Sequence, residues 1–185
     1  MGSYTTSTTD EDLNGILELQ KKNLPLNLTR EEIVSQGFVT VAHRLEDLQK
    51  MNAIERHIIA KDNNKVVAYL LAMTERSKMD IPVLIPMFEL FEKLEFKGQK
   101  LSAYNYIVIG QACVDKAYRG HGVFDGCYNF YCKSLKDKYD FAVTEIATSN
   151  LRSLRAHARV GFQTISEYTA PDNEAWSIVI WEWRH

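Results

Sequence analysis

The sequence predicts one mixed α/β domain over residues 1–185. Three observations support this prediction. An apolar run, Tyr106–Val114, leads through two glycines into an amphipathic run that begins at Val123, a pattern typical of a strand, a tight turn and a helix. Two further apolar runs flank Asn63-Asn64, as expected of a β-hairpin. Helical and strand patterns are interleaved along the chain without a repeat or a linker, which favours a single domain.

Short sequence signals predict the individual helices and strands. Helix starts are indicated at Thr9 to Asp12 and at Thr29 to Glu32, where a threonine precedes an acidic residue by three positions, as in a capping box. A third helical pattern runs from Arg44 to Met51. The remaining elements are predicted from periodicity: strands at His57–Asp62, Val66–Met73, Phe141–Ala147, Phe162–Tyr168 and Trp176–Trp183, and helices at Met87–Leu94 and Leu151–Arg159.

Residues 76–103 form the longest connection between these elements, and Pro82 and Pro86 interrupt it. Long connections within a domain often have a function of their own. Two interpretations of this segment therefore stay open. It is either a lid or substrate-side insertion, or an additional helix that covers the sheet.

Composition argues against several classes of function. The formal net charge of -2, without a long basic run, argues against binding of nucleic acid through its phosphates. No apolar stretch approaches the length needed to cross a membrane. The three cysteines, Cys113, Cys127 and Cys132, form neither a CxxC pair nor a metal-binding spacing with histidine, so we expect no metal site. An odd number of unpaired cysteines favours a reducing, cytoplasmic location.

The glycines between the predicted strand and helix suggest an anion site. Gly120 and Gly122 allow the backbone to turn tightly and direct its N–H groups outward, and the N-terminus of the following helix adds positive character. A glycine turn alone is a weak signal and is equally compatible with a simple turn. The segment lacks the Gly-Lys-Ser/Thr end of a P-loop and the three glycines of a dinucleotide-binding motif, which argues against a nucleotide-binding protein.

Two motifs together resemble those of the GNAT superfamily of N-acetyltransferases. Arg119-Gly120-His121-Gly122-Val123-Phe124 is similar to the family's acyl-CoA signature, Arg/Gln-x-x-Gly-x-Gly/Ala, with Phe124 in place of the final small residue. Members commonly continue with a strand, an Asn, a helix that contains an aromatic residue acting as an acid, and Gly-Phe. The matching positions in this chain are Asn150, Ser153, His157, Gly161 and Phe162.

The resemblance implies a central, mostly antiparallel sheet that splays apart between two parallel neighbouring strands, with acyl-CoA inserted in the gap. Those strands would be the one that contains Cys113 and the Phe141–Ala147 strand. Main-chain groups of Cys113 and Val114 would pair with pantetheine, and the glycine turn would hold the pyrophosphate. The implied cofactor-binding residues are Cys113, Val114, Arg119, Gly120, His121, Gly122, Val123, Phe124, Asn150 and Ser153. For Asn150, helix capping is the alternative. For Arg119, only the backbone is expected to contribute to the pyrophosphate site.

The resemblance also implies catalytic roles. His157 stands where the family usually has a tyrosine that protonates the departing thiolate, although a structural role on the helix is the alternative. Glu145 would deprotonate the incoming ammonium, or would instead pair with Arg152 or Arg155. Nucleophilic catalysis by Cys113 is disfavoured because no base stands at a supporting spacing.

The predicted function is therefore transfer of an acetyl group from acetyl-CoA to a primary amine of a small molecule or a peptide. A non-catalytic acyl-CoA-binding module on the same fold is the alternative. A homodimer is compatible with the sequence, and the acceptor amine is not identified by it.

Overall fold

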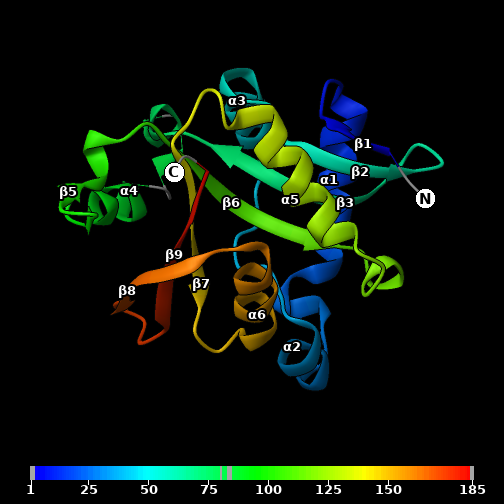
Figure 1. The fold of residues 1–185 in the computed structure, drawn as a ribbon. Helices are drawn as coiled ribbons and strands as arrows, with labels where there is room; N and C mark the ends of the chain where they lie inside the picture. Colours follow the sequence, from blue (N-terminus) through cyan, green and yellow to red (C-terminus); the bar gives the residue numbers. More distant parts are fainter. Residues whose placement is uncertain (1–2, 80, 83–84, 184–185) are drawn as a thin grey trace.

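The computed structural model describes residues 3–79, 81–82 and 85–183, and these form a seven-stranded sheet with helices on both faces (Figure 1). The sheet contains β1 (Ser3–Thr6), β2 (Ile58–Asp62), β3 (Lys65–Met73), β6 (Tyr106–Val114), β7 (Phe141–Ala147), β8 (Gln163–Thr169) and β9 (Ala175–Glu182), while β4 (Glu95–Phe96) and β5 (Gln99–Lys100) pair separately. The helices are α1 (Asp10–Asn23), α2 (Arg30–Gln36), α3 (Leu45–Ile54), α4 (Ile85–Phe91), α5 (Val123–Leu135) and α6 (Leu151–Val160).

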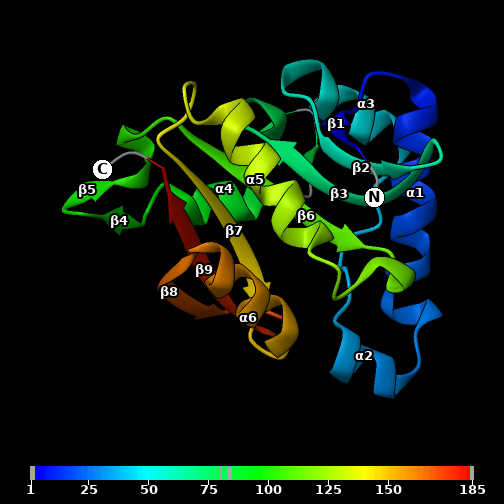
Figure 2. The ribbon, with the colours of Figure 1, turned by 45° about the vertical axis from the view of Figure 1, so that its right-hand side comes forward.

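The sheet separates between its two parallel strands. The strand order is β1-β2-β3-β6-β7-β9-β8, and only β6 and β7 run parallel. Their pairing covers Tyr106–Val108 against Phe141–Val143, although both strands continue well beyond it. The hydroxyl of Thr144 donates to the carbonyl of Ile109 at 2.7 Å, at the point where the ladder ends. This confirms the predicted mixed α/β fold with a splayed, mostly antiparallel sheet, and Figures 1 and 2 show the two strands diverging.

Each face of the sheet has its own apolar core. One core contains buried residues of α1, α3 and α4, packed against Tyr69, Val108 and Ile178 of the sheet. The other contains residues of α5, such as Tyr128 and Tyr131, and side chains of α6 pack against it. In Figure 2, α5 crosses in front of β3 and β6, while α1 stands apart from it on the right. The helices that follow β6 and β7 therefore share one face.

Local predictions about the first half of the chain agree with the structure in most places. Both capping boxes are formed, at the starts of α1 and α2. Asn63 and Asn64 form the β2–β3 turn with φ of 48° and 63°, a conformation that asparagine tolerates better than most residues. β1 and the β4–β5 hairpin were not expected from the sequence, because their strands are short and largely polar.

The segment 76–103 contributes to the core. The predicted helix over Met87–Leu94 is shifted toward the N-terminus, because Pro86 stands in the first turn of α4, where its missing N–H costs nothing. Phe88, Phe91 and Leu101 are fully buried, and Phe91 packs edge-on against Tyr106 with ring centroids 6.2 Å apart. Residues 80 and 83–84 of this segment lie outside the described part of the chain. A role as a lid or substrate-side insertion stays a prediction.

Candidate active site

A cleft of about 650 Å³ opens where β6 and β7 separate. One wall is the end of β6, from Ala112 to Val114, and the opposite wall is the cleft-facing side of α6. The glycine turn and the first turn of α5 border the cleft between these walls. Residues 34–39, which include the end of α2, line it as well. Three stretches that are far apart in the sequence, residues 34–39, 112–125 and 150–159, therefore line one cleft.

The glycine turn has the conformation that an anion site requires. Gly120 and Gly122 have φ of 79° and 75°, and open space surrounds the position of a Cβ on each. Gly122 is the N-cap of α5, so the first backbone N–H groups of that helix lie at the cleft without intrahelical partners. The structure thus brings Gly120, Gly122 and Val123 together at the cleft, as expected.

Phe124, which replaces the small residue of the signature, lines the cleft and also packs into an aromatic cluster. Its ring lies 4.8 Å from the ring of Tyr128 and 5.2 Å from that of His157, measured between centroids. This packing accommodates the bulk of Phe124 on the α5–α6 side of the cleft. His121 is different from its neighbours: it is exposed, and its Nδ1 lies 2.9 Å from the carbonyl oxygen of Arg119, so its side chain serves the turn itself.

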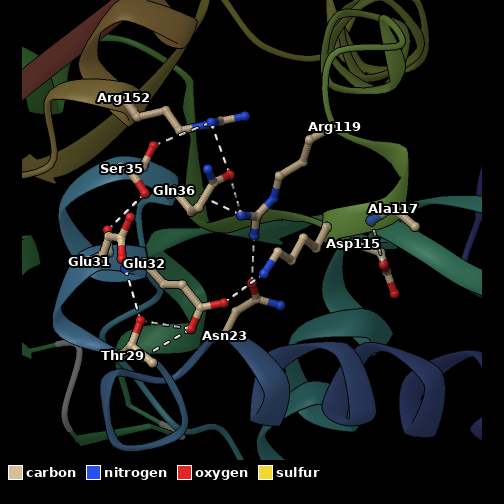
Figure 3. A network of polar contacts seen from close by, with 11 residues as sticks. Asn23, Thr29, Glu31, Glu32, Ser35, Gln36, Asp115, Ala117, Arg119 and Arg152 are labelled. Carbon is tan, nitrogen blue, oxygen red and sulfur yellow. Dashed lines mark hydrogen bonds and ion pairs between the residues drawn. The ribbon is translucent and has the colours of Figure 1, made fainter.

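The guanidinium of Arg119 bonds to protein groups around the cleft, and the contribution of its backbone to a pyrophosphate site stays a prediction. Its Nε donates to the carbonyl of Val114 at 2.9 Å, and its Nη2 donates to Oδ1 of Asn23 at 2.6 Å. Its Nη1 reaches both the carbonyl and the side-chain oxygen of Gln36, at 3.4 and 3.3 Å. Figure 3 shows this guanidinium between β6, the end of α1 and the end of α2. A multiply donating, planar cation is suited to such a junction.

The end of α2 is also bonded to the opposite wall of the cleft. Arg152 of α6 donates to the carbonyl of Ser35 at 3.4 Å and to the side-chain oxygen of Gln36 at 3.1 Å (Figure 3). Asn150 donates to the carbonyl of Phe38 at 3.3 Å. Gln36 therefore accepts from arginines on both walls. Gly37 follows with φ of 73°, and a Cβ there would lie 2.8 Å from Oδ1 of Asn150. The chain therefore requires glycine where it passes Asn150.

Cys113 and Val114 present their main chain to the cleft. Both pair with β3 on one edge, and β7 has already diverged on the other. The side chain of Cys113 is buried, and burial raises the pKa of its thiol to about 12. The thiol is therefore protonated at neutral pH, which agrees with the expectation that it is no nucleophile. The free edge of β6 is available to an extended ligand, as in β-augmentation.

Asn150 and Ser153 connect the start of α6 with the cleft. The Oδ1 of Asn150 accepts from the backbone N–H of Ser153 at 3.2 Å, which confirms the predicted cap. The hydroxyl of Ser153 lies 3.3 Å from Nδ1 of His157. Both residues line the cleft.

Glu145 lies on the opposite face of the sheet from α5 and α6. It pairs with Ile178 of β9, a member of the core that includes α1, α3 and α4. The hydroxyl of Tyr168 donates to Oε1 of Glu145 at 3.1 Å. Burial raises the pKa of the Glu145 carboxyl to about 7, and the hydrogen bond from Tyr168 partly opposes that rise. Neither Arg152 nor Arg155 pairs with it among the contacts of the described residues.

His157 is buried behind Phe124. Its Nδ1 lies 2.8 Å from the carbonyl of Ser153, and its Nε2 lies 2.6 Å from the hydroxyl of Tyr128. Because a carbonyl can only accept, Nδ1 bears the proton and Nε2 accepts from Tyr128. Burial lowers the pKa of His157 to about 4, so the imidazole is neutral at pH 7. The sequence placed this residue correctly on α6 but gave no sign of its partner Tyr128, which comes from α5.

Several residues at the cleft were not anticipated. Asn23, Gln36 and Phe38 belong to segments with no motif of their own. Arg155 and Arg159 also line the cleft, and Arg159 pairs with Asp125 of α5 at 2.9 Å. A helical projection of α6 would have found these arginines, because they share a side with Arg152.

The part of the chain that the structure describes contains neither a metal-binding cluster nor a membrane-spanning helix. Its histidines, cysteines and acidic residues form no group of three that could hold a metal ion. None of its helices combines the length and the apolar character required to cross a membrane.

Comparison with known proteins identifies a matching family model and solved structures of the same fold. The family model described as Acetyltransferase (GNAT) family matches residues 26–162. Among solved structures, the ribosomal-protein-S18-alanine N-acetyltransferase from Escherichia coli is 13% identical, with a TM-score of 0.65 and coverage of 100% of this chain and 96% of that one. The putative acetyltransferase yncA from Salmonella typhimurium, solved with its cofactor acetyl-CoA, is 11% identical, with a TM-score of 0.63 and coverage of 100% and 95%.

A third structure, an N-acetyltransferase from Staphylococcus aureus Mu50, is 15% identical, with a TM-score of 0.62 and coverage of 100% of this chain and 99% of that one. At these identities the structures show a common fold. No curated protein is similar enough to count as a relative. The family model, in contrast, spans most of the chain, including the glycine turn and the Asn150–Phe162 motif. The chain therefore belongs to the GNAT acetyltransferase family, and acetyl-CoA is its co-substrate.

Proposed function

We propose that the protein transfers the acetyl group of acetyl-CoA to a primary amine of a small molecule or a peptide, by direct attack of the amine. The observation that supports this most strongly is the divergence of β6 and β7 beyond Val108 and Val143, which we call the fork. The cofactor cleft opens at this fork on the α5–α6 face, and the carboxylate of Glu145 stands on the opposite face of β7. An amine and a thioester could therefore approach the same gap from two sides.

The residues of the cleft fit acetyl-CoA. The free edge of β6 suits the extended, amide-containing pantetheine, and the glycine turn at the N-terminus of α5 suits the pyrophosphate. The co-substrate supplies the thioester whose carbonyl carbon the amine attacks, and CoA leaves as a thiolate. A main-chain N–H near Val114 is proposed to stabilise the negative charge on the carbonyl oxygen.

Glu145 is proposed as the general base. An amine must lose a proton to attack, and a carboxylate whose pKa is about 7 accepts a proton efficiently near neutral pH. Tyr168 is proposed to hold the carboxylate in place through its hydrogen bond to Oε1. The proton passes either directly from the ammonium to Glu145 or through one water.

Water at the cleft is proposed to return a proton to the thiolate. The imidazole of His157 is neutral at pH 7, and its protonated nitrogen is directed to the carbonyl of Ser153. These contacts favour the structural alternative for His157: it accepts from Tyr128 and supports the wall that Phe124 lines. The acid role implied by the family resemblance stays a prediction that a variant can test.

The segment that contains α2 is proposed as the acceptor-side wall. It crosses the cleft and bonds to β6 through Arg119 and to α6 through Arg152. An acceptor would contact this segment before reaching the fork. Two neighbouring structures suggest which acceptors to test first: the S18-alanine enzyme is named for a protein alanine, and the NatC complex was solved with Gag peptide and CoA.

The decisive experiment measures release of free CoA thiol from acetyl-CoA over a panel of amines: peptides with different N-termini, lysine, polyamines and small metabolite amines. Amine-dependent thiol release, with an acetylated product of the expected mass, is the expected result. Tight acetyl-CoA binding without turnover on any amine would favour the non-catalytic binding module. Gel filtration and fractionation would test the homodimer and the cytoplasmic location, which stay predictions.

A further inference from the structure

Three arginines of α6 line the same cleft. Arg152, Arg155 and Arg159 are spaced by three and four residues, so their side chains project from one side of the helix. All three are exposed rather than buried. The cleft that they border is the proposed site of acetyl-CoA, whose phosphates are negatively charged, and this row of cations is complementary to them.

Two of the three guanidiniums already donate hydrogen bonds to protein groups. Arg152 donates to Ser35 and Gln36 of the α2 segment. Arg159 bonds to Asp125 through both Nε and Nη2, at 3.3 and 2.9 Å. Asp125 stands in the first turn of α5, and Arg159 thereby offsets a negative charge that would oppose phosphate binding there.

Arg155 is left as the available cation. Among the described residues, no hydrogen bond, ion pair or ring contact involves its guanidinium. It nevertheless lines the cleft, between the two arginines that are engaged. A guanidinium in this position can form a bidentate contact with a phosphate.

CoA carries phosphate in two places that such a site must distinguish, the pyrophosphate and the 3′-phosphate of the ribose. The pyrophosphate fits the backbone N–H groups at Gly122 and the start of α5, and these need no side-chain cation. The 3′-phosphate on the ribose is a separate monoester with no helix terminus assigned to it. We infer that Arg155 binds this 3′-phosphate and makes the enzyme select CoA over 3′-dephospho-CoA. The inference rests on acetyl-CoA as the co-substrate and adds the residue that recognises one end of it.

The experiment compares the Kd of CoA with that of 3′-dephospho-CoA by calorimetry, which requires no acceptor amine. We expect the wild-type protein to bind CoA about tenfold more tightly, the usual scale of a hydrogen-bonded charged contact at an exposed site. In Arg155→Gln the ratio should fall to about one, with dephospho-CoA binding unchanged. Arg155→Lys should restore part of the ratio, and added salt should reduce it in the wild type.

The matched control is Arg56→Gln, which removes an exposed arginine that does not line the cleft and should keep the wild-type ratio. A wild-type ratio near one would overturn the inference while leaving acetyl-CoA as co-substrate. An equal loss for both ligands in Arg155→Gln would also overturn it, because the guanidinium would then bind the pyrophosphate. Failure of the wild type to bind either ligand would overturn the proposed function as well.

Discussion

The two faces of the fork between β6 and β7 handle charge in opposite ways. The cleft face presents guanidiniums whose hydrogen bonds are shared among several segments, as Arg119 and Arg152 share Gln36. The other face holds the carboxyl group of Glu145, which is partly buried and accepts a hydrogen bond from Tyr168. The first arrangement keeps its charge at every physiological pH, because arginine does not titrate there. The second places a charge change near pH 7. Binding and proton transfer can therefore be altered separately.

The largest effect is expected from Glu145→Gln. Removal of the base should lower kcat by about 100-fold or more and abolish the rise of activity with pH through about 7. Binding of acetyl-CoA should be unchanged, because the cleft face is intact. The effect of the substitution on Tm shows whether the variant is still folded. A raised carboxyl pKa stabilises the fold below the ordinary value of about 4.3, and this stabilisation is lost as the pH rises through about 7. At pH 8 the amide should therefore not lower Tm.

Glu167→Gln is the matched control, since Glu167 is an exposed carboxylate on β8, at the edge of the same sheet. Its kcat should equal that of the wild type. Equal loss of activity in both variants, or unchanged activity in Glu145→Gln, would remove Glu145 from the mechanism and end the division between the two faces.

Gly122→Ala should weaken cofactor binding and leave the pH profile alone. An alanine at φ of 75° costs about 1–2 kcal/mol and moves the N–H groups that face the cleft. We expect a Kd for acetyl-CoA about tenfold higher, measured by calorimetry. Gly98→Ala is the control, because Gly98 has φ of 77° and open space around it in the β4–β5 turn. If both variants bind acetyl-CoA as the wild type does, the turn is no phosphate site.

Tyr168→Phe should change the pH dependence of the reaction more than its maximal rate. The hydroxyl of Tyr168 lowers the pKa of Glu145, so its removal should raise that pKa and shift the rise in activity to higher pH. Loss of a hydrogen bond worth about 1 kcal/mol predicts activity about threefold lower at pH 7, where Glu145 is half ionised in the wild type, with recovery at pH 9. A uniform loss at all pH values would show that Tyr168 has a different role.

The smallest effect on rate is expected from His157→Gln. The kcat at pH 7 should stay close to that of the wild type, whereas loss of a general acid would cost about 100-fold. The lowered pKa of His157 means that its neutral form stabilises the fold above about 6.5, and this stabilisation is lost as the pH falls through about 4. The wild-type Tm should fall over that range, and less steeply in the variant. A large loss of kcat would restore the acid role.

The sequence predicted the parts of this site that depend on local geometry. Glycines with positive φ, the cap at Asn150 and the hairpin at Asn63-Asn64 follow from what single residues allow, and all three are present. The order of elements along the chain was likewise readable from periodicity. Each of these features depends on residues that are close in sequence.

Features that depend on distant pairs were missed for the same reason. Gln36 meets Arg119 and Arg152 across separations of 83 and 116 residues, and no local pattern indicates such a contact. Tyr168 reaches Glu145 only because β9 lies between β7 and β8 in the sheet. The sequence predicted the two closing strands but not this order. The burial of His157 against Tyr128 depends in the same way on how α5 and α6 pack.

The short ladder between β6 and β7 has a mechanical consequence. Within the sheet, three residue pairs join everything before β7 to β7, β8 and β9, so the sheet has a seam that runs beside the cleft. A molecule bound along the free edge of β6 would add contacts beside the three residue pairs, and these contacts would resist separation of the two parts of the sheet. Under a pulling force applied to the two ends of the chain, the sheet should separate first between β6 and β7. Bound acetyl-CoA should raise the force needed for that separation.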